Sequence, residues 1–279
     1  MEAIGCYHKY MKRFIGIAVV GSVLLIVASI SAVVLLDGKT STPKQTINAP
    51  SSSQVLLSIP GIKPIPSIAE DYRSSDSLWV VVSKSRPLPE QDYSPTGIVV
   101  PSNIAVNMQK SKEEQSVRSD IVEPLTQMLT EAKAASHDLF LASGYRSYAL
   151  QETYYTNYVR TSGQEEADKF SAKPGYSEHQ TGLSFDLSLA NRQCYLEVCF
   201  GELPAGKWIA DNAHTYGFIV RYPAEKTDIT GYQYEPWHLR YVGTDLADAL
   251  HASRKTLDEI VPQLEAARAQ LVEQSLITE

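Results

Sequence analysis

After residue 76, the spacing of apolar residues along the chain alternates between that typical of strands and that typical of helices. Residues 77–83, 137–143 and 182–189 are short β-branched or alternating runs, which predict strands. Residues 121–132 carry apolar side chains at helical spacing, and residues 147–160 begin with a capping serine, so both predict helices. Because short strands are mixed with separate helices, the pattern favours an α+β domain over a doubly wound parallel sheet.

The same mixture continues to the end of the chain. Residues 206–218 predict a helix, and the strand-like runs FIVRY and YEPWHLRYVG follow it. Beyond them the pattern is helical, with an apolar stripe over residues 257–271 that Pro262 is expected to kink or split. We therefore expect a folded domain over residues 77–250 and a C-terminal helical tail over residues 251–279 that packs on it.

One long apolar run precedes the domain. Residues 14–36 are 23 consecutive residues without a charge, long enough as a helix to cross a hydrocarbon core of about 30 Å. Basic residues precede the run, so residues 1–13 are expected in the cytoplasm and the rest of the chain outside. Cleavage as a signal peptide near Ser29 and Ser31 is the alternative, but the run continues past them. We expect an uncleaved, single-pass transmembrane signal anchor in the cell membrane.

The stretch between this run and the domain has a different composition. Residues 37–76 are rich in Ser, Thr and Pro. Such a segment buries too little apolar surface to fold alone, so it predicts an extended linker. The linker would hold the domain away from the membrane surface on its extracytoplasmic side.

Charge and cysteine content narrow the function classes. The formal net charge of −7 argues against nonspecific nucleic-acid binding, which needs a basic surface. Cys6 lies before the apolar run, whereas Cys194 and Cys199 lie in the exported domain. An oxidising exterior allows a disulfide between the latter two, with free thiols as the alternative. A cysteine zinc knuckle is less favoured because a second cysteine pair is missing.

Candidate metal ligands lie in two stretches far apart in the sequence. YSEHQTGLSFDLS contains His179 and, seven residues later, Asp186, while YEPWHLRYVG contains His238. A hydrolytic zinc site takes three ligands from His, Asp or Glu and leaves the fourth position to water. If the two strands pair, these three side chains converge, and we expect them to bind Zn²⁺. A lone histidine would more often be structural, so the joint occurrence carries the prediction.

Glu235 is the candidate general base of this site. It precedes His238 by three residues, which places the two on opposite sides of a regular strand. Pro236 between them favours a bend, and a bend turns both side chains toward one cavity. A carboxylate beside a zinc-activated water can accept its proton and deliver it to the leaving amine.

Arg146 is the candidate for a fixed positive charge in the pocket. It lies in SGYRSY, at a strand-to-helix turn, where it can pair with a substrate carboxylate or stabilise an oxyanion. Ser177 and Gln151 could add neutral hydrogen bonds to the substrate. The structural alternatives are a salt bridge for Arg146, a turn cap for Ser177 and the helix surface for Gln151.

Four motifs taken together resemble the VanY-type D-alanyl-D-alanine carboxypeptidase family. They are SGYRSYALQ, YSEHQTGLSFDL, GKWIADNAHTYGFIVRY and TGYQYEPWHLRYVG. Their order and spacing match the family, and the resemblance covers about residues 77–250. The resemblance implies a small zinc-containing α+β fold of the Hedgehog/DD-peptidase type, with a small antiparallel sheet and flanking helices. The tail after residue 250 lies outside the resemblance.

The same resemblance implies roles for individual residues. It implies three zinc ligands, namely His179, Asp186 and His238. It implies that Glu235 is the catalytic base and that Arg146 and Gln151 face the substrate. None of these positions departs from the family pattern.

The implied substrate is the peptide stem of peptidoglycan, which is cleaved at its C-terminal D-alanine. We therefore expect a membrane-anchored zinc D-alanyl-D-alanine carboxypeptidase. An LD-carboxypeptidase acting on tetrapeptide stems and a cell-wall endopeptidase remain alternatives, because they would share this catalytic centre. A catalytically silent peptidoglycan-binding module is a rival of another class, and the intact Glu235 argues against it.

Overall fold

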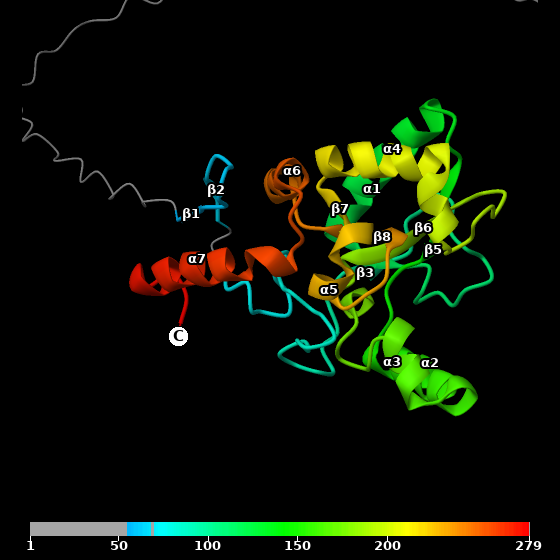
Figure 1. Ribbon diagram of the computed structural model, residues 1–279, viewed down its shortest axis with the longest axis horizontal. Helices are drawn as coiled ribbons and strands as arrows, with labels where there is room; N and C mark the ends of the chain where they lie inside the picture. The colour runs from blue at the N-terminus through cyan, green and yellow to red at the C-terminus, as the bar shows by residue number, and fades with distance from the viewer. Residues whose placement is uncertain (1–54, 68–69, 279) are drawn as a thin grey trace, which may run out of the picture. The chain divides into compact units, whose positions relative to one another are not determined.

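A four-stranded antiparallel sheet organises the folded part of the chain (Figure 1). The structure is a computed structural model that describes residues 55–67 and 70–278. The strand order is β5-β6-β8-β7. The strands are β5 (Leu139–Ser143), β6 (Ser184–Leu189), β7 (Phe218–Tyr222) and β8 (Glu235–Tyr241).

The two faces of this sheet differ in chemistry. Helices α1 (Val122–Ala134) and α4 (Pro204–Asn212) share one hydrophobic core with it. The strand residues in that core include Leu141, Phe185, Leu187, Trp237 and Leu239. Because side chains alternate along a strand, Asp186, His238 and Arg240 lie on the opposite face. One face is therefore the core, and the other is a buried polar surface.

Short strands and further helices complete the described part of the chain. Strand β1 (Leu56–Leu57) pairs with β2 (Ile65–Pro66), and β3 (Ile98–Val99) pairs with β4 (Val117–Arg118). The other α-helices are α2 (Tyr148–Ser162), α3 (Gln164–Phe170), α5 (Thr227–Thr230), α6 (Thr244–Ser253) and α7 (Val261–Glu273). The 3₁₀ turns are η1 (Ser119–Ile121), η2 (Glu178–Thr181), η3 (Val198–Glu202), η4 (Ala213–Tyr216), η5 (Ala224–Lys226) and η6 (Asp258–Ile260).

This architecture confirms the predicted α+β class. Helix α2 begins where expected because the Ser147 hydroxyl accepts a hydrogen bond from the Leu150 amide at 3.3 Å. The helix predicted over residues 206–218 is α4 followed by η4, and it ends at Gly217 with φ of 85°. A left-handed residue at that position favours glycine and terminates the helix.

The strand predicted at residues 77–83 is wrong. This run is buried, but it forms turns and an isolated bridge instead of a strand. Its carbonyl groups at Leu78 and Val80 accept hydrogen bonds from the Arg240 side chain, at 3.0 and 2.8 Å. In a strand, these carbonyl groups would accept from the N–H groups of a neighbouring strand, and here the guanidinium group of Arg240 takes the place of those donors.

The linker that we expected to reach residue 76 ends earlier. Residues 55–67 and 70–76 belong to the same compact unit as the domain. Their buried apolar residues are Val55, Leu57, Ile59 and Tyr72. These side chains share a hydrophobic core with α6 and α7. Scattered apolar residues among the prolines thus bury surface that the overall composition did not reveal.

The C-terminal segment packs on the domain, as predicted. Its buried stripe is Leu257, Ile260, Val261, Leu264, Ala267 and Leu271. Pro262 stands in the first turn of α7, where a missing N–H costs nothing, so the residue starts this helix. The helical tail is therefore divided before Pro262, at residues 254–260.

The predicted cytoplasmic segment 1–13, the predicted anchor 14–36 and the first part of the predicted linker lie outside the described residues. Within residues 55–67 and 70–278, no helix combines the length and the apolar character needed to cross a bilayer.

Candidate metal centre

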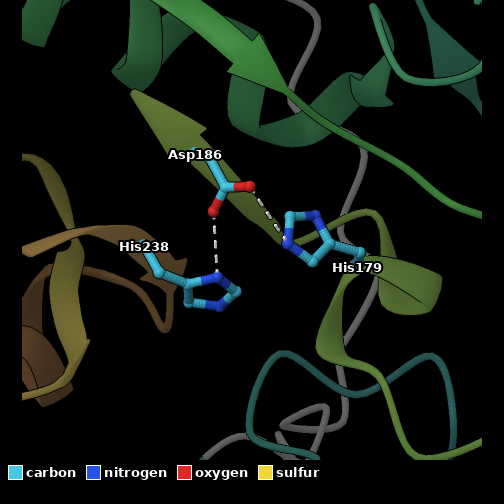
Figure 2. A group of neighbouring side chains, drawn as sticks. All are labelled: His179, Asp186 and His238. Atoms are coloured by element: carbon cyan, nitrogen blue, oxygen red, sulfur yellow. Dashed lines mark hydrogen bonds and ion pairs between the residues drawn. The ribbon is translucent and has the colours of Figure 1, made fainter. Parts of the chain in front are cut away.

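His179, Asp186 and His238 converge on the polar face of the sheet (Figure 2). One potential ligand atom from each lies within 4.8 Å of the others, and all three residues are buried. The Asp186 carboxylate lies between the two imidazoles. Its Oδ2 is 3.6 Å from His179 Nε2, and its Oδ1 is 3.1 Å from His238 Nδ1.

Strand register brings two of these residues together. Asp186 on β6 pairs directly with His238 on β8, although 52 positions separate them in sequence. His179 comes from η2, the turn that precedes β6. Gly182 ends this turn in the left-handed conformation with φ of 69°, and a Cβ there would lie 2.7 Å from Ile98. Glycine at this position therefore permits the tight return from η2 into β6.

A backbone hydrogen bond orients the His179 ring. Its Nδ1 donates to the Gly144 carbonyl at 2.7 Å, so Nε2 is the unprotonated nitrogen that faces Asp186. The Arg146 amide in turn donates to the His179 carbonyl at 3.2 Å. The turn after β5 and the turn before β6 thus hold each other, with His179 between them.

The two imidazoles differ in protonation. Burial, together with the nearby positive charge of Arg146, lowers the pKa of His179 to about 3, although the negative charge of Asp186 acts in the opposite direction. Burial also opposes protonation of His238, but Asp186 and Glu178 outweigh it and raise its pKa to about 9. His179 is therefore neutral, whereas a proton occupies the His238 side of the cluster in the absence of a cation.

These residues fit a zinc ion. Two imidazole nitrogens and one carboxylate are a typical three-ligand set of hydrolytic zinc, with a fourth position for water. The neutral His179 and the ionised Asp186 already have the protonation states that a ligand needs. A divalent cation would take the place of the proton on His238 Nδ1, the nitrogen that faces Asp186.

Glu235 lies beside this cluster at the start of β8. Its Oε2 is 4.0 Å from His238 Nδ1. The β7–β8 register shifts between Val220 and Tyr222, and Glu235 pairs with Tyr222 beyond the shift. This irregularity next to Pro236 agrees with the bend that we expected. Burial, with a contribution from Asp186, raises the pKa of Glu235 to about 7, the range suited to a general base at neutral pH.

Arg146 adds a positive charge near the three ligands. It follows β5, and its charge contributes to the low pKa of His179 and lowers that of Glu235. Its buried Nε has no hydrogen-bond partner among the described residues. A buried guanidinium donor without an acceptor is unusual in a folded protein and indicates a place for an anionic group.

Gln151 and Ser177 are both buried, and their side chains have different surroundings. The Gln151 amide nitrogen donates to the Ala172 carbonyl at 2.7 Å, so it ties α2 to the segment before η2. Its Oε1 has no hydrogen-bond partner in the described part of the chain. Ser177 precedes η2 and makes no side-chain capping bond. The structure thus leaves an oxygen of Gln151 available but commits its amide nitrogen.

The sequence did not predict Glu178, which lies behind His238. Its Oε1 accepts hydrogen bonds from Arg221 Nε at 2.8 Å and Arg240 Nη1 at 2.9 Å. Its Oε2 accepts from Ser184 Oγ at 3.0 Å and lies 3.8 Å from His238 Nε2. The available signal was one arginine in each of two apolar strands, because a buried arginine requires a carboxylate partner.

Known proteins resemble this chain in sequence and structure. The VanY family model, described as D-alanyl-D-alanine carboxypeptidase, matches residues 114–244. YodJ of Bacillus subtilis (strain 168) is 38% identical over 190 residues, covering 68% of this chain and 69% of that protein.

Two solved structures extend the likeness. The LD-carboxypeptidase LdcB is 38% identical with a TM-score of 0.64, covering 68% of this chain and 87% of that one. A mutant of the vancomycin-resistance D,D-pentapeptidase VanY from a VanB-type cassette, in complex with Zn(II), is 29% identical with a TM-score of 0.53. That match covers 66% of this chain and 98% of that one. The chain therefore belongs to the VanY-type D-alanyl-D-alanine carboxypeptidase family.

Proposed function

We propose that this protein is a zinc carboxypeptidase that removes the C-terminal D-alanine from peptidoglycan stem peptides. Membership of the VanY family supports a carboxypeptidase that acts on peptidoglycan. The observation that carries the proposal is the convergence of His179, Asp186 and His238 within 4.8 Å, with Glu235 beside them.

Each residue has a separate task in this proposal. His179, Asp186 and His238 hold the ion, and zinc, when bound, polarises the scissile carbonyl and acidifies the attacking water. Glu235 accepts the proton of the attacking water at a carboxylate oxygen and passes it to the leaving amine. Because its pKa is raised to about 7, Glu235 can both accept and release a proton near neutral pH.

Arg146 is the proposed anchor for the terminal carboxylate of the stem. Its unpaired Nε supports this role, because a substrate carboxylate would supply the missing acceptor. The same charge could stabilise the oxyanion of the tetrahedral intermediate. The oxygens of Gln151 and Ser177 are the proposed neutral partners of the substrate peptide.

A second candidate is cleavage of tetrapeptide stems as an LD-carboxypeptidase. The specific observation in its favour is the likeness to LdcB, at 38% identity against 29% for the D,D-pentapeptidase VanY. Both activities need a carboxylate anchor and the same catalytic centre. The two differ only in the stereochemistry and length of the stem that the pocket accepts.

One assay distinguishes these functions. The purified protein is incubated with pentapeptide and tetrapeptide stems, with and without a metal chelator, and the products are weighed by mass spectrometry. We expect chelator-sensitive release of D-alanine from the pentapeptide. Release from the tetrapeptide alone would establish the LD activity, and internal cleavage would establish an endopeptidase. Bound metal without any release would contradict the enzymatic proposal in favour of a binding module.

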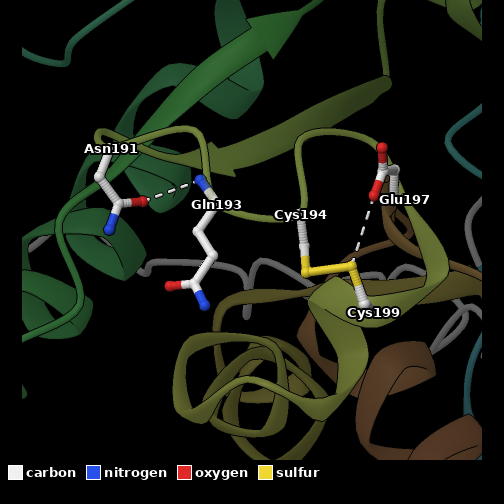
Figure 3. Close-up of a disulfide and its surroundings, with 5 residues drawn as sticks. All are labelled: Asn191, Gln193, Cys194, Glu197 and Cys199. Atoms are coloured by element: carbon white, nitrogen blue, oxygen red, sulfur yellow. Dashed lines mark hydrogen bonds between the residues drawn. A yellow bond between two sulfur atoms is a disulfide. The ribbon is translucent and has the colours of Figure 1, made fainter.

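We also propose that residues 14–36 anchor the domain on the extracytoplasmic side of the cell membrane. Cys194, in the loop after β6, forms a disulfide with Cys199 in η3 (Figure 3), which supports an oxidising compartment. The peptidoglycan substrate is found in the same compartment. Protease added to intact spheroplasts should digest the domain, and alkaline extraction should leave the chain in the membrane. Protection from protease, or release by alkali, would contradict this topology.

A further inference from the structure

A second charged cluster lies directly behind the metal ligand His238. We call Glu178, Arg221, Arg240 and Asp258 the arginine cluster. Arg221 Nη1 donates to Asp258 Oδ2 at 2.5 Å, and both arginines donate to Glu178 Oε1. The side chains of Glu178, Arg221 and Arg240 are fully buried. Two guanidinium groups therefore meet two carboxylates, which makes this buried cluster neutral overall.

The two oxygens of Glu178 have different partners. Oε1 is occupied by the two guanidinium groups. Oε2 accepts from the Ser184 hydroxyl and faces His238 Nε2 at 3.8 Å. The other imidazole nitrogen, Nδ1, faces Asp186 at 3.1 Å. The His238 ring is thus bracketed by two carboxylates, one on each nitrogen.

This arrangement selects which nitrogen of His238 is available to a cation. With a carboxylate at each nitrogen, the free ring can hold a proton on both. Once a cation displaces the proton on Nδ1, Glu178 favours retention of the proton on Nε2, so that the ring is held as a neutral Nδ1 ligand. His238 Nε2 has no hydrogen-bond partner in the described part of the chain. Glu178 is the acceptor positioned for it after a small movement of the ring.

We propose that Glu178 is the positioning residue for the metal ligand His238, and that Asp258 supports it through Arg221. Asp258 lies in η6, beyond residues 114–244 that match the family model. The C-terminal segment therefore reaches the metal centre through Asp258, Arg221 and Glu178. This inference rests on the proposed zinc site, and it adds residues that the three ligands alone do not include.

Replacement of Glu178 by glutamine tests the proposal. Glutamine keeps the shape, but its single carbonyl oxygen is needed as the acceptor for the two arginines, so its NH₂ group faces His238 Nε2. An N–H donor at this position favours the tautomer of His238 without a proton on Nε2. The zinc dissociation constant of the full chain is measured by competition with a chromophoric chelator. We expect Glu178→Gln to bind zinc about 10–100-fold more weakly than wild type, the loss typical of removing a partner behind a ligand.

A spectroscopic signature separates positioning from a purely structural role. The cobalt-substituted protein reports ligand geometry through its visible absorption bands. A positioning role predicts a shifted cobalt spectrum in Glu178→Gln. An unchanged spectrum and unchanged zinc affinity in a less stable protein would overturn the proposal and reduce the cluster to a structural one.

Asp258→Asn provides a second variant if Glu178→Gln fails to fold. Asp258 lies at the edge of the cluster with a 14% exposed side chain, so its replacement leaves the Glu178 pairs in place. We expect zinc binding to weaken several-fold. The matched control is Glu259→Gln, because Glu259 is the next residue on η6 but pairs with Lys226 at 2.9 Å. The control should bind zinc as wild type does, and equal affinities for Asp258→Asn and this control would overturn the support by Asp258.

Wild-type zinc binding distinguishes the two levels of inference. A wild-type protein that binds no zinc would overturn the proposed function and this inference together. A wild-type protein that binds zinc, with Glu178→Gln binding it equally well, would overturn the inference alone and leave the proposed function intact.

Discussion

Two groups of buried charged side chains share the polar face of the sheet, and they differ in how completely their charges are paired. In the arginine cluster, Glu178 accepts from both arginines and Asp258 accepts from Arg221. In the metal centre, His238 Nε2 and Arg146 Nε have no hydrogen-bond partner among the described residues.

The pKa values follow the same division. Burial alone would raise the pKa of Glu178, but Arg221 and Arg240 outweigh it and hold that pKa well below its usual range. Burial raises the pKa of Glu235 to about 7, because the positive charges of His238, Arg146 and Lys84 lower this pKa by less than burial raises it. Glu178 is therefore always ionised, whereas Glu235 can exchange a proton near neutral pH. Complete pairing is typical of a scaffold, and incomplete pairing is typical of a site that awaits a ligand.

The largest effect is expected from Glu235→Gln. Glutamine cannot accept the proton of the attacking water, so kcat should fall by about 10²–10⁴-fold. The three ligands are untouched, so zinc content measured by atomic absorption should stay near that of wild type. Fixed-time assays of D-alanine release would provide kcat. A variant with unchanged kcat would assign the base to another residue.

Replacing one arginine in each group should produce opposite phenotypes. Arg221→Met leaves Asp258 without its guanidinium partner and removes one of two cations from the buried Glu178, so the free energy of unfolding should fall by about 3–5 kcal/mol. Arg146→Met removes a side chain whose Nε is already unpaired, so stability should change by less than about 1 kcal/mol. Its kcat/KM should instead fall about 100-fold, because the carboxylate anchor is lost.

Urea unfolding and steady-state kinetics on both variants measure this contrast. Metal-free protein should be used for unfolding, so that zinc binding does not contribute to stability. Strong destabilisation by Arg146→Met, with stability unchanged in Arg221→Met, would reverse the assignment of scaffold and site.

The sequence predicted the metal centre better than its scaffold. His179, Asp186 and His238 could be chosen because few side chains ligate zinc and because their motifs resemble a family pattern. The direct pairing of Asp186 with His238 depends on strand register, which sequence patterns only suggest. Glu178 was missed because a charged residue beside a ligand is usually interpreted as solvent-exposed, and its arginines come from separate strands.

The errors in the fold have the same origin. Residues 77–83 have the composition of a strand, but guanidinium groups satisfy their carbonyls. Residues 55–67 have the composition of a linker, but they find a hydrophobic partner surface about 200 residues later, on α6 and α7. Both outcomes depend on side chains distant in sequence, and local periodicity carries no information about them.

A third prediction concerns zinc affinity and pH. The His238 pKa of about 9 means that zinc must displace one proton at neutral pH, whereas His179 is already neutral and Asp186 already ionised. Apparent affinity should therefore fall about tenfold for each unit of decreasing pH over this range. Chelator competition at several pH values provides the slope. A zinc affinity independent of pH would mean that zinc binding does not displace a proton from His238.

The smallest effect is expected from Lys84→Met. The Lys84 ammonium lowers the pKa of Glu235, so its removal should raise that pKa. Glu235 acts as a base only when it is deprotonated, so kcat/KM should fall as the pH decreases through the pKa of Glu235. This pKa is about 7 without a metal ion, and a bound cation would lower it. The acidic limb of the pH profile should therefore move to higher pH in Lys84→Met by a fraction of a unit. Lys63→Met, at an exposed lysine, is the control and should leave the limb unchanged. A shift to lower pH would mean that the limb reports a group other than Glu235.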